Sequence, residues 1–537
     1  MSEVLEQPVV LNKSEAKTAG WPVASYLPAM LPIIGAVLMT LARIKAGTGF
    51  ISDGALIVIA LACYLTAAVF LLTNIYAPSS TAQRLGLWLT SLGVFFNLSS
   101  WGVRWIAARD HEFEILARQG GEMPWFFRYI PFANLYDLSI AFAFGAGLTT
   151  LLITRRKNMS FLGALSLPMI SLILLLALFI GNDIISLQPI LDSYWRPIHV
   201  GVASLSYGVA LVCFAIAVLY LLKDGVKTES MAIWTSIFAL AVIATIGGAF
   251  GSFPVFTTGT YRASTFFVGE GTRVPLPLRA TIPYVGAILI ISTLLLLGVL
   301  ACFSQYLAKA SEAAKTWGHR LLAFALVAQG LAITALVSQI KSLKNILPLI
   351  DTTQYAQFGQ WVAEHAAGMP SEQIALLSSA ELQNLSAQFI RENGSLLQFS
   401  LNANPVELAS LITAFAGTLF VILFSFRTER IRESLPPLER LDGMMYKTAS
   451  VTFALLAMLL ITGAVWANES WGRYWAWDPK ETGAFVAWLT YAAYLHTRIA
   501  RGWTGRRSAY FAIAGFLFIV FTYLGVSYLL KGLHSYA

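Results

Sequence analysis

The sequence predicts an all-α, polytopic integral membrane protein. Of its 537 residues, 57% are hydrophobic and only 12% are charged, whereas about 25% of the residues in soluble domains are charged. The mean hydropathy is +0.68, and long apolar segments recur along the whole chain. Lipid therefore surrounds most of this protein. The same composition argues against a disordered, collagen-like, coiled-coil or disulfide-scaffold protein.

A helix needs about 20 mostly apolar residues to cross a bilayer. Applied along the chain, this length predicts about 13 transmembrane helices. In chain order they are expected at residues 22–41, 55–72, 85–103, 138–153, 161–180, 199–222, 231–249, 282–302, 321–340, 406–424, 450–466, 483–499 and 508–530. An odd number of crossings places the two ends of the chain on opposite sides of the membrane.

The distribution of lysine and arginine indicates which connections between the helices lie on the cytoplasmic side of the membrane. They are dense in the short connections at residues 155–157, 223–227, 427–432 and 498–507. Cytoplasmic connections carry an excess of these residues, so we expect the N-terminus inside and the C-terminus outside. Residues 1–20 lack an apolar core, so no cleavable signal peptide is expected.

Three long connections then face outward, at residues 104–137, 251–280 and 341–405. The last one is polar and has helix-like apolar spacing around residues 355–366 and 374–390. It is expected to form a small cap outside the membrane.

The charge and the cysteines exclude several functions. The net charge of +8 comes from short basic runs between apolar segments, which is a topology signal rather than a nucleic-acid surface. Cys63, Cys213 and Cys302 lie far apart inside apolar segments, which argues against a disulfide, a zinc site or a redox pair. The chain has no CxxCH segment, so it is not itself a c-type cytochrome.

A tryptophan-rich stretch, WANESWGRYWAWDPKET, occupies residues 466–482 on the predicted outer side. Four of the 15 tryptophans fall within it, among them Trp471, Trp475 and Trp477. Tryptophan is enriched at membrane interfaces, so an anchor at headgroup level is one interpretation. The other is an aromatic surface for a large planar ligand.

Asp478 also has a purely structural interpretation. It precedes Pro479 at the start of a predicted helix, and Glu481 follows three residues later. Together these residues form the pattern of a capping box. Capping alone explains both carboxylates but leaves the tryptophans unexplained.

Three of the six histidines stand at informative positions. His199 and His534 lie at the predicted outer ends of their helices. A single histidine there is usually a polar cap, but two on the side that carries the tryptophans predict axial ligation of haem iron. His496 lies in the inner half of its helix, where it either snorkels to the cytoplasmic edge or ligates haem within the membrane. No role is assigned to His111, His319 or His365.

Together these residues resemble a known family. WGRYWAWDPKET is similar to the WWD signature of haem-handling membrane proteins, and its DPKET ending resembles the CcsA/ResC branch of the System II cytochrome c synthases. Four further segments resemble that branch: PFANLYDLS, SYWRPIHVGVASLSY, TYAAYLHTRIARGW and FTYLGVSYLLKGLHSYA. The resemblance covers residues 85–222 and 436–537.

The resemblance implies a protein of the bacterial inner (cytoplasmic) membrane that receives haem b as substrate and presents it on the external, periplasmic face. There haem is attached covalently to the CxxCH segment of apocytochrome c, which would make the chain a holocytochrome c synthase, or haem lyase, acting with a partner. By position, His199 and His534 match the external haem ligands and His496 matches one of two intramembrane ligands. The haem-edge motif is matched by Trp471, Trp475, Trp477 and Asp478. The second intramembrane histidine is expected from a CcsB-like membrane partner.

The resemblance also divides the chain into four regions. Residues 1–84 hold a cytoplasmic tail and two extra helices, and residues 85–222 form the first part of the haem-handling core. Residues 223–435 are inserted helices that include the outward loop 341–405. Residues 436–537 hold the tryptophan-rich motif and the rest of the core.

Three other functions stay open. A System I haem lyase usually has Val-Glu-Asn after Trp-Asp-Pro, and Lys480-Glu481-Thr482 argues against it. A transporter of another small solute is expected to show repeated halves and broken helices, and neither is visible. A quinone-reactive respiratory subunit needs transmembrane histidine pairs, for which His496 alone is available.

Overall fold

The computed structural model describes residues 27–119, 126–156, 159–181, 184, 192–246, 254–269, 272–341, 352–393, 398–400, 405–526, 530 and 532. His534 lies outside these residues. The helices are α1 (Leu27–Ala46), α2 (Asp53–Tyr76), α3 (Ser80–Gln119), α4 (Leu135–Thr154), α5 (Leu162–Ile180), α6 (Trp195–Lys223), α7 (Thr228–Ile246), α8 (Pro254–Thr258), α9 (Val285–Lys309), α10 (Glu312–Lys341), α11 (Tyr355–Trp361), α12 (Ser371–Ile374), α13 (Ser379–Asn393), α14 (Pro405–Ser425), α15 (Thr428–Ser434), α16 (Leu438–Trp471), α17 (Pro479–Arg501) and α18 (Arg506–Val520). The strands are β1 (Tyr261–Gly269), β2 (Thr272–Ile282) and β3 (Gln398–Ser400).

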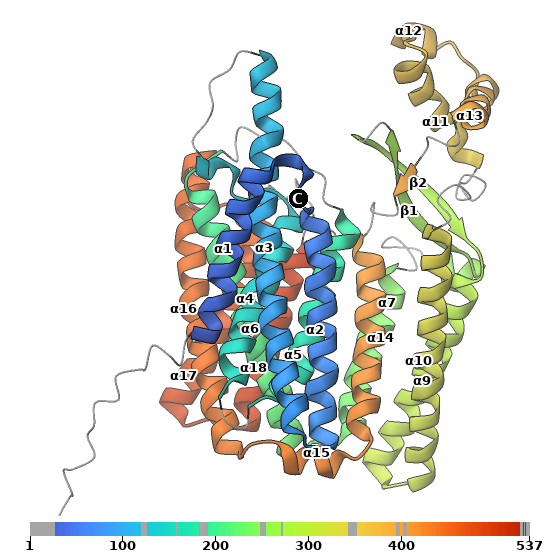
Figure 1. The fold of residues 1–537 in the computed structure, drawn as a ribbon. Coiled ribbons are helices and arrows are strands. Elements are labelled where there is room, and N and C mark those ends of the chain that lie inside the picture. Colours follow the sequence, from blue (N-terminus) through green and yellow to red (C-terminus); the bar gives the residue numbers. More distant parts are fainter. Residues whose placement is uncertain are drawn as a thin grey trace, which may run out of the picture.

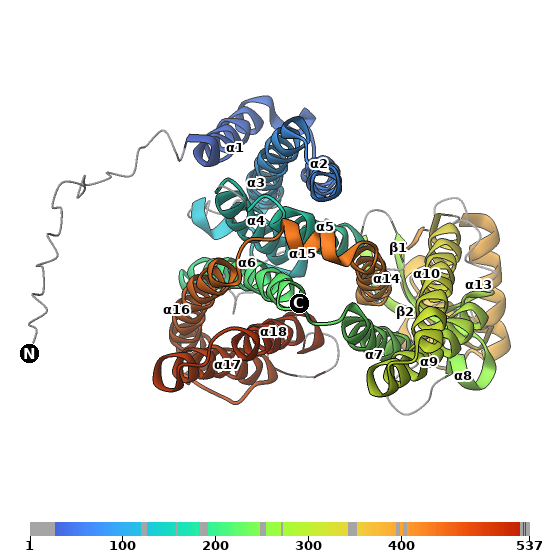
Figure 2. The ribbon, with the colours of Figure 1, turned by 90° about the horizontal axis from the view of Figure 1, so that it is seen from below.

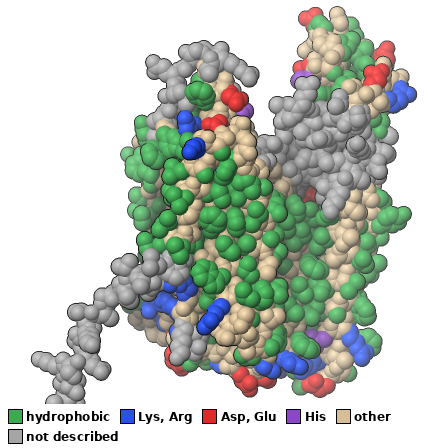
Figure 3. Space-filling view, viewed as in Figure 1, with side chains coloured by type: hydrophobic (Ala, Val, Ile, Leu, Met, Phe, Trp, Pro, Cys, Tyr) green, Lys and Arg blue, Asp and Glu red, His purple; other side chains and the backbone are tan. Residues whose placement is uncertain are grey.

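The predicted all-α membrane fold is confirmed (Figure 1). Every predicted transmembrane segment overlaps a helix, and 11 of the described helices are long and apolar enough to cross a membrane. The other two predicted crossings lie in α3 and α17, which are more polar. Figure 3 shows hydrophobic side chains over the middle of one face and charged ones gathered at its lower edge, as a lipid-embedded bundle requires. The exact number of crossings and their direction stay predictions.

Helix α3 is longer than the sequence indicates. Hydropathy ends the predicted crossing at Val103, but the helix continues to Gln119 and extends beyond its neighbours in Figure 1. After Val103 the sequence mixes aromatic residues with closely spaced acids and bases, which suits a water-exposed helix. The first half of the connection predicted at residues 104–137 is therefore helical.

Two bundles lie side by side in Figure 2. The core bundle, α2–α6 with α16–α18, contains the largest cluster of buried hydrophobic residues. We call α7, α9, α10 and α14 the inserted bundle because they fall within residues 223–435, the region predicted to be inserted. They share a second cluster with β1, β2 and α11. Helix α14 also packs on α5 and so joins the two bundles.

A three-stranded antiparallel sheet of order β2-β1-β3 lies next to the inserted bundle, and the sequence analysis did not predict it. The missed signal was a pair of runs, STFFV before and TRVPL after Gly269-Glu270-Gly271, which are rich in β-branched or aromatic residues and separated by glycines, as is typical of a hairpin. The helices expected around residues 355–366 and 374–390 are present as α11 and α13, packed together as a small cap.

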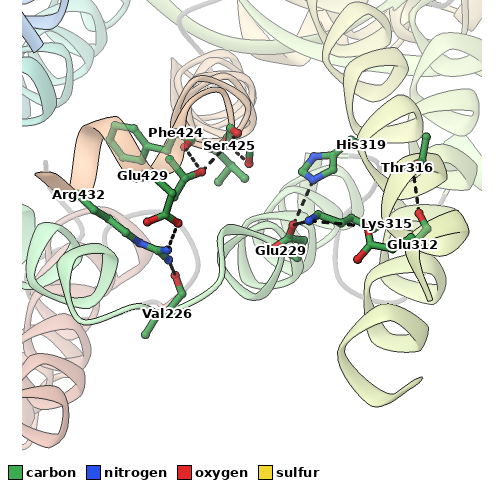
Figure 4. A network of polar contacts seen from close by, with 12 residues as sticks. Val226, Glu229, Glu312, Lys315, Thr316, His319, Phe424, Ser425, Glu429 and Arg432 are labelled. Atoms are coloured by element: carbon green, nitrogen blue, oxygen red, sulfur yellow. Dashed lines mark hydrogen bonds and ion pairs between the residues drawn. The ribbon is translucent and has the colours of Figure 1, made fainter. Parts of the chain in front are cut away.

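Polar contacts hold the inserted bundle together at the end away from the cap (Figure 4). The Glu229 side chain on α7 is only 8% exposed. One of its carboxylate oxygens lies 3.3 Å from His319 Nε2 and 3.9 Å from Lys315 Nζ, both on α10. These contacts fix the register between α7 and α10.

Candidate functional site

A pocket lies where helix ends of the core bundle meet, beside the tryptophan-rich stretch. Its cavity volume is about 160 Å³, and it opens to solvent. Its walls come from the start of α4, α6 and α17, the end of α16 and the turn after α18. Of the predicted site residues, His199, Trp471 and Trp475 line it. His199 and Trp475, which are far apart in the sequence, therefore line the same pocket.

His199 is held in one orientation by α16. Its Nδ1 atom lies 3.0 Å from the backbone oxygen of Leu459 and 3.4 Å from Oγ1 of Thr462. A carbonyl oxygen only accepts, so Nδ1 carries the hydrogen, and a neutral imidazole then has its lone pair on Nε2. This tautomer is the one that ligates a metal through Nε2.

The ring of His199 fits because the α16 residue nearest to it in this direction, Gly463, has no side chain. A Cβ atom placed on Gly463 would lie 2.7 Å from Cε1 of His199, so only glycine leaves room for the imidazole. Trp466 packs on the other side, with 5.7 Å between the ring centroids of His199 and Trp466. Helix α16 therefore provides both the hydrogen-bond acceptor and the space for this histidine.

The tryptophans divide into two groups. Trp466, Trp471 and Trp475 line the pocket. Trp477 does not; its side chain is 69% exposed and stands edge-on to Trp475 at 5.7 Å. Its φ of +58° lies in the left-handed region, which is unfavourable for a bulky residue. The pocket thus contacts two of the three tryptophans predicted to bind the ligand.

The predicted capping box at the start of α17 is confirmed. The Asp478 carboxylate accepts from the backbone N–H of Lys480 at 3.2 Å, and Glu481 Oε2 accepts from the backbone N–H of Asp478 at 3.2 Å. The same Glu481 oxygen accepts from Ala476 N–H at 2.9 Å. Glu481 therefore holds the backbone on both sides of the strained Trp477.

Two hydrogen bonds tie the tryptophan-rich end of α16 to the start of α6. Ser193 Oγ donates to Glu469 at 2.9 Å and accepts from the backbone N–H of Trp195 at 3.1 Å. Residues of the PFANLYDLS segment, from Phe132 to Leu135, form a further wall. Asn134 caps α4 by accepting from the backbone N–H of Asp137 at 3.0 Å. These contacts give the pocket a rigid frame.

Of the remaining predicted ligands, His496 does not line the pocket. His496 is exposed near the far end of α17, about 24 Å along the helix from Lys480 at 1.5 Å per residue. His534 lies outside the described residues. Gly532 is described, and its backbone lies so close to the Asp478 carboxylate that a Cβ atom would collide with it.

Two cations in this pocket, Arg196 and Lys480, were not predicted from the sequence. Arg196 is 3% exposed. Burial lowers the pKa of Lys480 to about 8, although the Asp478 carboxylate opposes this shift. The signal was present in the spacing, because Arg196 stands three residues before His199 and so on the same side of a helix.

The part of the chain that is similar to known proteins contains the pocket. The family model for cytochrome c assembly proteins matches residues 132–268 and 404–534. These two stretches contain the residues that line the pocket. The unmatched stretch between them, 269–403, covers β2, α9, α10 and the cap.

Individual relatives match part of the chain. The cytochrome c biogenesis protein CcsA of Prochlorococcus marinus (strain MIT 9515) is 48% identical over 147 residues, which are 27% of this chain and 47% of that protein. CcsA of Synechococcus sp. (strain CC9902) is 36% identical over 230 residues, 41% of this chain and 69% of that protein. The chain thus spans about half of the first relative and two thirds of the second.

Among solved structures, the cytochrome c haem lyase CcmF is 15% identical and covers 89% of this chain and 77% of its own, with a TM-score of 0.27. That score is too low to indicate a shared arrangement of helices. The family model and the CcsA relatives show that this integral membrane protein belongs to the cytochrome c assembly protein family, as a member of the CcsA type.

Proposed function

We propose that the chain binds haem in this pocket and presents it for covalent attachment to apocytochrome c, as a System II component. The observation that carries the proposal is the orientation of His199. Its Nδ1 atom is bonded to the Leu459 carbonyl, so Nε2 is the nitrogen that can ligate iron. The apolar pocket with Trp471 and Trp475 suits a large planar ring.

His534 is the proposed second axial ligand. Gly532 lies against Asp478, at the start of α17 beside the pocket. His534 follows Gly532 by two residues in the sequence, and two residues of extended chain reach at most about 7 Å. Ligation by two histidines from distant parts of the chain would hold iron by both faces of the ring.

The reaction proposed for the bound haem is the formation of two thioethers. Each cysteine S–H of the CxxCH segment adds across a vinyl C=C, with sulfur joining one carbon and hydrogen the other, so no external oxidant is required. The chain's contribution is to hold haem b in position for this addition. The proposed location is the bacterial inner membrane, with the pocket on the periplasmic face.

A CcsB-like membrane partner completes the proposal. His496 is exposed on α17, at the end of the helix away from the pocket. An ionisable residue that faces out of a membrane bundle needs a polar neighbour. A histidine from the partner is proposed to pair with His496 and to hold haem on its way to the outer pocket.

The test is the absorption spectrum of the detergent-purified protein with haem. Wild-type protein is expected to show the bands of bis-histidine haem and to support cytochrome c maturation in cells. His199→Ala should lose the bands and abolish maturation. His365→Ala is the matched control, because His365 lies in the cap and is exposed. Unchanged bands and maturation in His199→Ala would remove the pocket from the proposed function.

A further inference from the structure

Two cations, the buried Arg196 and the partly buried Lys480, line the largely apolar pocket. Arg196 is the second residue of α6 and is 3% exposed. Its Nη2 donates to the backbone oxygen of Arg128 at 2.6 Å and its Nη1 to that of Ile130 at 3.3 Å. These bonds fix the plane of the guanidinium group, which is the preferred partner of carboxylates.

Lys480 approaches the same pocket from α17, where it is also the second residue of the helix. The pKa of its ammonium is lowered to about 8 by burial, so the charged form is costly in the structure as it stands. An anion that entered the pocket would stabilise that charged form.

Both cations stand where helix geometry disfavours them. The first turn of a helix carries the positive end of its dipole, so a basic residue there lowers helix stability. Helix α6 has no acidic residue in its first turn to compensate. Among the described residues that line the pocket, Glu481 is the one acidic residue, and it already accepts two backbone N–H groups. Asp478 also lies beside Lys480, but it does not line the pocket, so the charged side chains of the described lining, Arg196, Lys480 and Glu481, favour an anion.

Two indole groups add donors to this wall. Trp466 is 5% exposed, and both Trp466 and Trp475 line the pocket. The Nε1–H of each is buried and has no acceptor in the described part of the chain. Buried N–H donors normally have an acceptor. A carboxylate that entered the pocket could supply acceptor oxygens to these two indole N–H groups.

We infer that Arg196 and Lys480 bind the two carboxylates of the haem that the proposed function places in this pocket. Haem carries its carboxylates on one edge of the ring. Holding them fixes the rotation of the ring about the axis through iron, and the vinyl groups then face away from the two cations. Arg196 and Lys480 are thus positioning residues that decide which edge of haem is presented to the incoming thiols. The inference rests on the proposed function.

The test compares haem with haem dimethyl ester, in which both carboxylates are neutral. Each ligand is titrated into detergent-purified wild type, Arg196→Met and Lys480→Met, with Lys447→Met as the control because Lys447 is exposed on α16. Each pocket substitution is expected to weaken haem binding about tenfold, equivalent to about 1.4 kcal/mol, and to leave ester binding unchanged. Arg196→Lys keeps the charge and is expected to restore part of the difference, should Arg196→Met fold poorly.

The outcomes separate the two proposals. Equal losses for haem and ester in both variants would overturn the carboxylate contact while leaving haem binding in place. Wild-type protein that binds neither ligand with imidazole ligation would overturn the proposed function and this inference together. Bis-histidine bands that persist in both variants with weaker haem affinity, and with ester affinity unchanged, would support both.

Discussion

Lys480 is the residue from which we expect a pH dependence of haem binding. Its surroundings are charged: Asp478 and Glu481 belong to its own helix segment, and Arg196 lines the same pocket from α6. Burial lowers the pKa of Lys480 to about 8, so its ammonium is present below that pH and lost above it. Attraction to a haem carboxylate is therefore present at pH 7 and disappears as the pH rises.

We accordingly predict that haem affinity falls about tenfold between pH 7 and pH 9. The measurement is the Kd of haem at a series of pH values, with the dimethyl ester as the uncharged reference. Lys480→Met should flatten the profile and leave the remaining affinity near the wild-type value at high pH. An equally steep profile in Lys480→Met would assign the titration to another group.

Individual site residues were predictable to different degrees. His199, Trp471 and Trp475 stand out in sequence because histidine is rare in this chain and tryptophan is locally dense. Arg196 and Gly463 do not stand out. Their roles depend on which helix lies opposite, which composition does not reveal. Trp477 was predicted with its neighbours, but a left-handed backbone turns its side chain away from the pocket.

At the scale of helices, the pair α6 and α16 forms the back of the pocket. The two helices pack along much of their length, and His199 on α6 reaches the backbone of α16 at Leu459. A Cβ atom on Gly463 would lie 2.7 Å from Cε1 and 3.0 Å from Nδ1 of His199. A methyl group at this position would therefore push the ring away from the Leu459 carbonyl.

Gly463→Ala is therefore expected to weaken haem binding about tenfold or more, because overpacking costs about 1–3 kcal/mol. The bis-histidine bands should be lost or shifted at the same time. Gly443→Ala is the control, since Gly443 lies on the same helix and a Cβ atom there would have no neighbouring atom within 4 Å. Spectra of Gly463→Ala that match those of the control would show that the ring tolerates a shift of α16.

Element boundaries were predicted less well than element types. Hydropathy locates the part of a helix that suits lipid, so it placed every long helix of the core bundle but ended α3 at Val103 instead of Gln119. The hairpin of β1 and β2 was missed because its short polar and β-branched runs carry no membrane signal. The capping box at Asp478 was predicted correctly because it depends only on residues within one turn.

At the scale of the whole molecule, the two ends of the inserted bundle meet. Arg432 Nε donates to the backbone oxygen of Leu222 at 2.9 Å, and its Nη2 donates to that of Val226 at 3.1 Å. Lys223 Nζ in turn donates to the backbone oxygen of Arg432 at 2.6 Å. Figure 4 shows Arg432 and Val226 side by side. Adjacent ends are typical of a unit inserted into an existing fold.

We therefore predict that joining residue 227 to residue 428 through a short Gly-Ser linker leaves the pocket intact. Every residue that lines it lies outside 228–427, and removing four long helices, an even number, preserves the direction of those that follow. The shortened protein is expected to be monodisperse in detergent and to keep the haem bands of the full chain. Adding Arg432→Met should lower its melting temperature by removing the contacts at the junction. A monodisperse shortened protein without haem bands would show that the inserted bundle helps to bind haem.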